Sequence, residues 1–318
     1  MKALAIDLGG SHATCALVDG VHLVAKEVVT FPDGLKLAPI LPALEGALQR
    51  LLGQGSGHRS GHESAQGVGF GFCGLVDAPN TRVSSTNGKF VDAVDVDLGA
   101  WSRSRFGLPL RLENDARLAL LGEYAAGAAQ GESDVVMFTL GTGIGGVAMM
   151  GGRPLQGKHG QAGVLGGHVP VRVNGRRCTC GGMGCAESEA AGWSLPLVCA
   201  EWPGFADSPL SRAEINFQNL FAFATDGDPV AQQVQQHCLS VWGATAVAAI
   251  HAFDPDVLIY GGGVMKSGDV ILPFIQNYVN QYAWTPWGKV QVRAAQLGND
   301  AALLGVVPLF QQETGFVR

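Results

Sequence analysis

The sequence lacks any apolar run that approaches the ~20 residues a membrane-spanning helix needs. At the N-terminus, MKALAIDLGGSHAT is apolar only as far as Asp7, which is too short for the core of a secretory signal peptide. Concentrated positive charge is also missing: lysines and arginines are scattered, and the formal net charge is −6. We therefore expect a cytoplasmic protein with neither a membrane partner nor a nucleic-acid partner.

Cysteine is scarce, whereas glycine is abundant. The chain has seven cysteines, an odd number that fits a disulfide framework poorly. In a cytoplasmic protein, clustered cysteines are more often metal ligands. The 46 glycines are roughly twice the usual share and gather in a few places. With 318 residues and a 47% hydrophobic content, the chain can build two domains with cores of ordinary size.

Short apolar runs of β-type composition alternate with helical stretches, which indicates an α/β fold. Residues 65–77 (AQGVGFGFCGLVD) fit one buried strand, residues 188–250 are largely helical in composition, and residues 300–310 fit a final helix. Two segments share one design, a strand followed by a glycine turn and a second strand, at residues 6–10 (IDLGG) and 139–143 (TLGTG). The sequence therefore predicts two related halves, each presenting one glycine hairpin to a shared cleft.

Three glycine-rich turns follow apolar strands, at residues 7–14, 141–146 and 261–264. Without a Cβ atom the backbone can approach an anion closely, and consecutive N–H groups form a concave donor site. The first turn adds the carboxylate of Asp7, and the second adds the hydroxyl of Thr142. Each turn alone is compatible with a simple tight turn, but three at strand ends favour a nucleotide site.

The segment ENDAR (113–117) lies at a predicted strand-to-helix junction. One interpretation is helix capping, in which Asn114 or Asp115 accepts N–H bonds from the first turn. In a protein with phosphate-binding turns, Asp115 is also a candidate general base.

Three cysteines, Cys178, Cys180 and Cys185, stand close together in RRCTCGGMGCAE. Zinc usually takes four ligands, commonly including a histidine, and the nearest upstream histidine is His168. The spacing predicts a structural Cys3His zinc site. The other reading, buried inert thiols, fits three cysteines at this spacing less well.

Together these motifs resemble the ROK family, named for repressors, open reading frames and kinases, over nearly the whole chain. The family segment D-x-G-G-T appears as DLGGS, with Ser11 in place of threonine, and E-N-D is intact at 113–115. G-T-G-x-G-G is intact at 141–146, and the adenosine segment appears as GGGV. The zinc signature, G-H followed by C-x-C-G-x-x-G-C-x-E, ends at Glu187.

The resemblance implies the actin-like (ribonuclease H-like) two-domain ATPase fold, with ATP and sugar held in the cleft. A small domain would cover residues 1–115, rejoined by a C-terminal helix at 300–318, and a large domain with the zinc loop would cover 116–299. The implied activity is that of a glucokinase-like sugar kinase, which transfers the γ-phosphate of MgATP to a hydroxyl, commonly the 6-OH, of a hexose or hexose derivative. Family members are usually homodimers or homotetramers.

The resemblance also assigns residue roles. Asp115 would be the catalytic base, for which an ordinary carboxylate pKa would suffice. The implied sugar-contacting residues are Asn87, Asn114, Asp115, His168 and Glu187. The residues implied for ATP and Mg²⁺ are Asp7, Gly9, Gly10, Ser11, Gly141, Thr142, Gly143, Gly261, Gly262 and Gly263. Zinc would do no chemistry but would hold its loop so that His168 and Glu187 face the sugar.

One position departs from the family pattern. The run before the zinc histidine is usually E-x-G-H, whose glutamate binds sugar hydroxyls, but Leu165 stands there in this chain. The sequence therefore does not name the sugar. The alternative function is a non-catalytic sugar-sensing regulator. ROK repressors carry a winged-helix domain ahead of the first phosphate segment, and since only six residues precede Asp7 we expect no DNA-binding domain.

Overall fold

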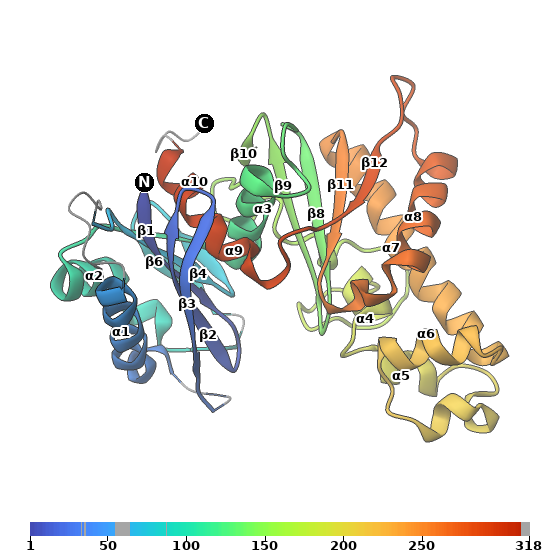
Figure 1. The fold of residues 1–318 in the computed structure, drawn as a ribbon. Coiled ribbons are helices and arrows are strands. Elements are labelled where there is room, and N and C mark those ends of the chain that lie inside the picture. The colour runs from blue at the N-terminus through green and yellow to red at the C-terminus, as the bar shows by residue number, and fades with distance from the viewer. Residues whose placement is uncertain (33, 35, 55–63, 87, 313–318) are drawn as a thin grey trace. The chain divides into compact units, whose positions relative to one another are not determined.

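The structure is a computed structural model that describes residues 1–32, 34, 36–54, 64–86 and 88–312. It divides into two compact units (Figure 1). The first unit comprises Met1–Gly131, Gln156–Ala162 and the chain from Gln296 onward, and the second comprises Glu132–Leu155 and Gly163–Ala295.

The first unit contains a five-stranded sheet in the order β3-β2-β1-β4-β7. Its strands are β1 (Lys2–Leu8), β2 (His12–Asp19), β3 (His22–Thr30), β4 (Val68–Phe72) and β7 (Leu110–Asn114). The first three strands form an antiparallel meander, whereas β4 pairs parallel to both β1 and β7. A separate hairpin joins β5 (Leu75–Asp77) and β6 (Arg82–Ser85).

Helices cover both faces of this sheet. Successive side chains of a strand point to opposite faces, so β1 serves two cores. Leu4, Ile6 and Leu8 belong to a core that includes residues of α1 (Leu37–Gln54) and α2 (Leu98–Phe106), with η1 (Ala93–Asp95) nearby. Ala3 and Ala5 belong to a second core, built with residues of α3 (Asp115–Ala126), α9 (Ala301–Leu304) and α10 (Val306–Gln311).

The division of the chain differs from the expected one because of α3. The expected boundary at residue 115 is the first residue of this helix, but α3 packs with α9 in the first unit. The approach is close: a Cβ atom on Gly122 of α3 would lie 2.0 Å from the carbonyl oxygen of Ala301. The second unit therefore begins at Glu132.

Two other elements are shorter than the sequence predicts. The single strand expected over residues 65–77 is β4 followed by β5, with a break at Cys73 and Gly74. The final helix is split at Gly305 into α9 and α10, after η6 (Gly298–Asp300).

The second unit contains a five-stranded sheet in the order β10-β9-β8-β11-β12. Its strands are β8 (Val135–Leu140), β9 (Ile144–Met150), β10 (Arg153–Pro154), β11 (Val257–Gly261) and β12 (Gln291–Ala294). Antiparallel β10, β9 and β8 are followed by β11 and β12, which run parallel to β8.

The expected helical region, residues 188–250, lies in the second unit. Its helices pack into one large core with alternate residues of β8 such as Val136 and Phe138. The helices and turns of this unit are η2 (Gly166–His168), α4 (Ala186–Ala190), α5 (Leu195–Ala200), η3 (Phe205–Asp207), η4 (Pro209–Arg212), α6 (Phe217–Thr225), α7 (Pro229–Phe253), η5 (Gly263–Ser267) and α8 (Gly268–Tyr282). Among the described residues, no helix combines the length and apolar composition needed to cross a bilayer.

The two sheets have the same strand order, a three-stranded antiparallel meander whose first strand is extended by two parallel strands. In each unit the predicted glycine hairpin connects the first two strands of that meander. The prediction of two related halves is therefore confirmed at the level of topology. In open sheets of this kind, ligands bind at the carboxyl ends of the parallel strands, where the candidate residues also lie.

Candidate active site

The first group of candidate residues lies where β1, β4 and β7 end side by side. The register aligns Asp7 with Gly71 and Glu113, and one residue further it aligns Leu8 with Phe72 and Asn114. Because parallel strands end at one edge, Asp7 and Asp115 share the same end of the sheet although they are far apart in sequence.

The turn after β1 contains Gly9, Gly10 and Ser11. It is closed by the N–H of Gly9, which donates to the carbonyl oxygen of His12 at 2.9 Å. Gly10 leaves little room for a side chain, since a Cβ atom there would lie 3.1 Å from Nζ of Lys89. The turn therefore presents bare backbone beside a cationic side chain, which suits phosphate.

Asn114 caps α3, as the capping interpretation predicts. Its Oδ1 accepts the N–H groups of Ala116 at 3.0 Å and Arg117 at 3.2 Å. Its Nδ2 donates to the carbonyl oxygen of Gly74 at 3.1 Å and to Oδ1 of Asp115 at 3.0 Å. The amide thus positions the neighbouring carboxylate. A sugar hydroxyl that bound to Nδ2 of Asn114 would have to share it with Gly74 and Asp115.

Asp115 is a largely buried carboxylate at the N-terminus of α3. Its Oδ1 also accepts the N–H of Ala116 at 2.9 Å. Burial raises the pKa of Asp115 to about 6, although the hydrogen bond from Ala116, the charge of Lys89 and the Asn114 amide all oppose this shift. The carboxylate is a better proton acceptor than an ordinary aspartate, and it still ionises near neutral pH.

Asp7 lies near Asp115. Burial, and then the charge of Asp115, raise the pKa of Asp7 to about 7. Two largely buried carboxylates favour the presence of a cation, so this pair fits a magnesium-bound phosphate.

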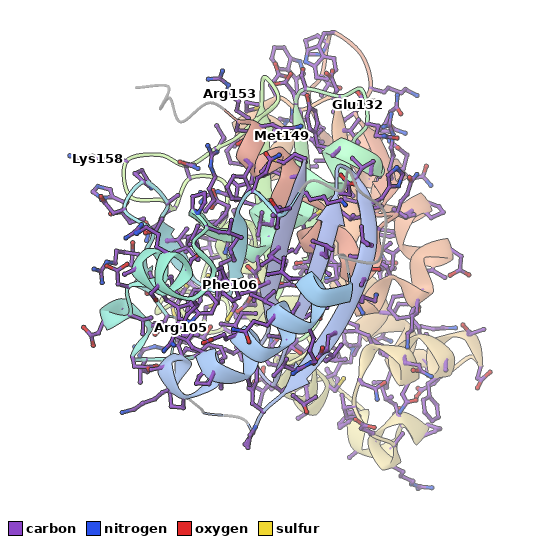
Figure 2. All side chains as sticks on the ribbon, turned by 60° about the vertical axis from the view of Figure 1, so that its left-hand side comes forward. Arg105, Phe106, Glu132, Met149, Arg153 and Lys158 are labelled. Carbon is purple, nitrogen blue, oxygen red and sulfur yellow. The ribbon has the colours of Figure 1, made fainter. Side chains whose placement is uncertain are left out.

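A buried ion pair stands behind these carboxylates. Glu113 and Arg117 are each 1% exposed, and their side chains lie 3.2 Å apart. Gln156 donates to Glu113 at 3.0 Å, and Arg117 donates to the carbonyl oxygens of Gly160 and Ala162. The pair thereby holds the segment Gln156–Ala162 against the start of α3, while Lys158 of this segment points into solvent (Figure 2).

The second group of candidate residues lies where β8 and β11 end. Thr139 and Gly261 are paired in register, so the turn Gly141–Gly143 and the turn Gly261–Gly263 follow neighbouring strands. Gly262 has a φ of 92°, and a Cβ atom there would lie 2.3 Å from the carbonyl oxygen of Leu140. The turn Gly261–Gly263 therefore packs against Leu140, the residue that directly precedes the turn Gly141–Gly143.

Glu187 holds the Gly141–Gly143 turn. Its Oε2 accepts the N–H of Ile144 at 2.9 Å, and a Cβ atom on Gly143 would lie only 2.7 Å from that oxygen. Its Oε1 accepts from the indole N–H of Trp193 at 3.3 Å and from the hydroxyl of Thr179 at 3.4 Å. The sequence suggests a sugar contact for Glu187, and the structure shows that this residue fixes the backbone of the Gly141–Gly143 turn.

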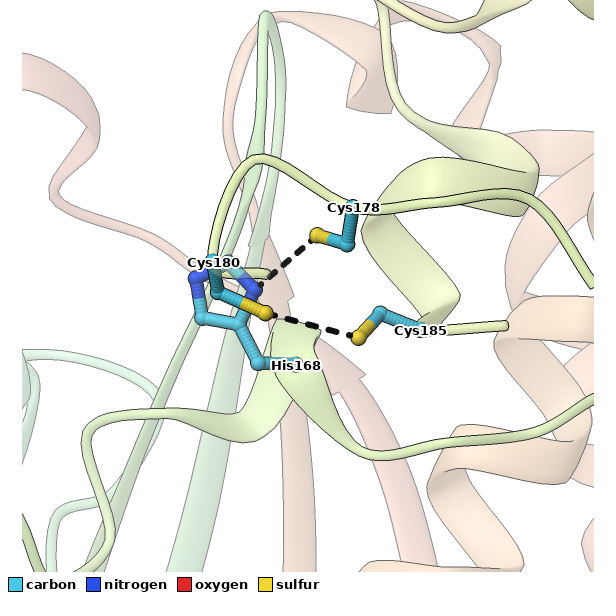
Figure 3. A group of neighbouring side chains, drawn as sticks. All are labelled: His168, Cys178, Cys180 and Cys185. Atoms are coloured by element: carbon cyan, nitrogen blue, oxygen red, sulfur yellow. Dashed lines mark hydrogen bonds between the residues drawn. The ribbon is translucent and has the colours of Figure 1, made fainter. Parts of the chain in front are cut away.

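The four predicted zinc ligands converge (Figure 3). Nδ1 of His168 lies 3.5 Å from Sγ of Cys178, and Sγ of Cys180 lies 3.7 Å from Sγ of Cys185. All four ligand atoms lie within 4.8 Å of one another. A tetrahedral zinc with Zn–S bonds of ~2.3 Å requires sulfur–sulfur separations of ~3.8 Å, so the cluster has the size of such a site.

A metal ion bound here would have to displace protons from the thiols. Burial, followed by the neighbouring Cys180 and Cys178, raises the pKa of Cys185 to about 12. A thiol of this kind becomes a thiolate near neutral pH only beside a strong positive charge. The donor set therefore fits zinc.

Leu165, in the place of the family glutamate, directly precedes η2. Its side chain is 42% exposed, and its carbonyl oxygen accepts the N–H of His168 at 2.9 Å. The residue is thus a surface side chain rather than part of the core. Asn87, the remaining predicted sugar contact, lies outside the described residues.

Lys89 was missed by sequence reasoning. It belongs to the loop between β6 and η1, and nothing local indicates that it meets Gly10. The one available signal is its position in TNGKF, two residues after the predicted sugar contact Asn87.

Two sheets of identical order, each with a glycine hairpin and candidate residues at the carboxyl ends of its parallel strands, define the actin-like two-domain ATPase fold. The ROK family model matches residues 3–313, and the chain belongs to the ROK family.

Relatives of this chain include named kinases. The protein named glucokinase from Thermotoga maritima is 30% identical, and the alignment covers 99% of each chain. The ROK hexokinase from Thermus thermophilus aligns with a TM-score of 0.80 at 29% identity, over 98% of this chain and 100% of that one. A ROK family glucokinase from Streptomyces griseus, in complex with glucose and AMPPNP, gives a TM-score of 0.76 at 31% identity, with the same coverage.

Regulatory relatives occur as well. The xylose repressor of Bacillus spizizenii is 24% identical, over 75% of this chain and 60% of the repressor.

Proposed function

We propose that this protein is an ATP-dependent sugar kinase that transfers the γ-phosphate of MgATP to a hydroxyl, the 6-OH, of a hexose or hexose derivative. The observation that carries the proposal is the Asp115 carboxylate, fixed by Asn114 and raised in pKa to about 6, at the same end of the sheet as the glycine turn after β1. The glucokinase relatives, at about 30% identity over the full chain, support the same function.

In this proposal Asp115 accepts the proton of the sugar hydroxyl as that oxygen attacks the γ-phosphorus. Its raised pKa improves its basicity, while burial keeps competing water away. Asp7 would hold Mg²⁺, which would neutralise phosphate charge, and the Gly9–Ser11 backbone would bind phosphate oxygens. Phosphoryl transfer mainly requires alignment and charge neutralisation, which these groups provide.

The second unit contributes nucleotide and sugar contacts. The turn Gly141–Gly143 binds phosphate through its backbone, and Gly261–Gly263 lies under the adenosine. His168 uses Nδ1 toward the zinc, which leaves Nε2 for a sugar hydroxyl. Zinc bound by His168, Cys178, Cys180 and Cys185 is structural and keeps Glu187 in place.

The proposal is tested by sugar-dependent ADP release over a panel of hexoses, hexosamines and their N-acetyl derivatives. At least one sugar should raise ADP release well above the rate without sugar. Binding of a sugar without any ADP release would instead support the second candidate, a non-catalytic sugar-sensing regulator. Two observations favour that candidate: the missing glutamate at Leu165 and the xylose repressor among the relatives.

A further inference from the structure

Lys89 is placed against the first phosphate turn. Its Nζ, Cε and Cδ atoms all lie within 3.9 Å of the position that a Cβ atom of Gly10 would occupy, with Nζ the nearest at 3.1 Å. The end of the side chain therefore lies along the turn, and the absence of a side chain at residue 10 gives it room.

The lysine faces a group of acidic residues. Asp7 at the end of β1, Asp115 at the start of α3 and the thiol of Cys73 after β4 influence one another electrostatically. The charge of Lys89 lowers the pKa of both Asp115 and Cys73, opposing the effect of their burial. It therefore adds positive charge beside these acidic groups.

A structural role does not account for Lys89. Its side chain is exposed, and within the described residues no carboxylate lies within ion-pair distance of it. Among the residues that the structure describes, this ammonium has no carboxylate partner, and it lies next to backbone suited to phosphate and close to the candidate base. It is therefore available to an anionic ligand.

We propose that Lys89 is a catalytic residue that binds a non-bridging oxygen of the γ-phosphoryl group and follows it during transfer. The proposal rests on the kinase function. In the step, the sugar oxygen forms a bond to phosphorus, its proton passes to Asp115, and the bridging P–O bond breaks with its electron pair leaving on ADP. Lys89 stays protonated throughout and neutralises charge on the transferring group.

The test compares Lys89→Met with Lys89→Arg in the full chain, using Lys289→Met as the matched control because Lys289 is an exposed lysine of the second unit. With MgATP and the best sugar, Lys89→Met should lower kcat by about a hundredfold and change the KM for sugar less than threefold. Lys89→Arg should recover part of the loss, and Lys289→Met should match wild type. The acid limb of the kcat profile should move to higher pH in Lys89→Met, because the lost charge no longer favours ionised Asp115.

A second measurement does not depend on turnover. Isothermal titration with MgADP and MgAMPPNP should show that Lys89→Met weakens binding of AMPPNP about tenfold more than binding of ADP, since only AMPPNP carries the γ-phosphoryl group. Equal weakening of both nucleotides, a kcat within threefold of wild type, or a loss confined to the KM for sugar would each overturn the proposal. If wild type released no ADP with any sugar, the kinase function would fail, and the nucleotide comparison would still decide the role of Lys89.

Discussion

At the scale of single residues, burial sets the chemistry of the candidate site. Asp115 and Asp7 are ordinary aspartates in the sequence, but burial raises the pKa of Asp115 to about 6 and of Asp7 to about 7. The sequence suggests that an ordinary carboxylate pKa would suffice for the base. The structure gives this candidate base a pKa above the ordinary value, and this has consequences for both activity and stability.

The pH dependence of activity should reflect the ionisation of Asp115. Because the base works only when it is ionised, kcat/KM should fall about tenfold per pH unit below pH 6.

Asp115→Asn should keep the fold but lose roughly 10²–10⁴-fold in kcat, since the amide cannot accept the proton. A profile that stays flat to pH 5, or a variant with more than about a tenth of wild-type kcat, would exclude Asp115 as the base.

The pH dependence of stability should reflect the ionisation of Asp7. Its pKa is raised from 3.8 in the unfolded chain to about 7 in the folded one, so the folded state binds the proton more tightly. The free energy of unfolding therefore falls as pH rises from about 4 to 7, and the full cost is present above pH 7. Asp7→Asn should stabilise the ligand-free protein at pH 8 by on the order of 1–3 kcal/mol, and by less at pH 5. Urea unfolding at the two pH values measures this; an equal gain at both would contradict the burial argument.

Substitution of Leu165 tests whether the missing glutamate determines which sugar the protein prefers. The side chain is 42% exposed, so Leu165→Glu removes little packing and adds a carboxylate where the family has one. We expect a shift in kcat/KM toward glucose relative to analogues modified at the 1-, 2- or 3-position, by about five- to a hundredfold, as a hydrogen bond of ~1–3 kcal/mol implies. Leu165→Met is the matched control and should change nothing. A wild-type protein that already prefers unmodified glucose by the largest margin would show that another group replaces the glutamate.

At the scale of elements, the zinc loop and the nucleotide turn form one connected structure. The loop ends at Cys185, α4 begins one residue later, and Glu187 in its first turn accepts the N–H of Ile144. The N–H groups of Gly192 and Trp193 donate to the carbonyl oxygens of Gly141 and Thr142, each at 2.9 Å. Loss of zinc should therefore loosen the Gly141–Gly143 turn as well as the proposed sugar contacts.

This connection gives a prediction. Wild-type protein prepared without chelator should contain about one zinc per chain, and Cys178→Ser should lower that content. In Cys178→Ser, hydrogen exchange at the amide of Ile144 should accelerate about tenfold or more, because Glu187 is no longer held. Cys199→Ala, a buried cysteine of α5 outside the cluster, is the control and should keep its zinc. Metal analysis that finds no zinc in wild type, or unchanged Ile144 exchange after zinc loss, would contradict this account.

The elements themselves could largely be predicted from the sequence, because apolar periodicity and glycine turns are local signals. The strand–turn–strand design around Asp7 and around Thr142 and the Asn114 cap are of this kind. The side-chain contacts could not be predicted in the same way. Lys89 against Gly10 and Glu187 against Gly143 join segments far apart in sequence, and the packing of α3 on α9 decides the division near residue 131.

At the scale of the whole molecule, two sheets of one topology place the glycine turns that we propose to bind phosphate at the carboxyl ends of their strands. The first unit adds the proposed base Asp115 and the cationic Lys89, and the second adds the Cys3His cluster with Glu187. Membership in the ROK family fits this arrangement, but the family includes both kinases and repressors. Identification of the reaction product distinguishes a kinase from a non-catalytic regulator.

The most direct test is the identity and amount of that product. Wild-type protein is incubated with MgATP and the sugar that raises ADP release most, and ADP and sugar phosphate are quantified by phosphorus NMR. We predict one sugar phosphate for each ADP, with the phosphate coupled to the protons at carbon 6. ADP formed without sugar phosphate, or a sugar that binds while neither product appears, would contradict the assignment of this protein as a sugar kinase.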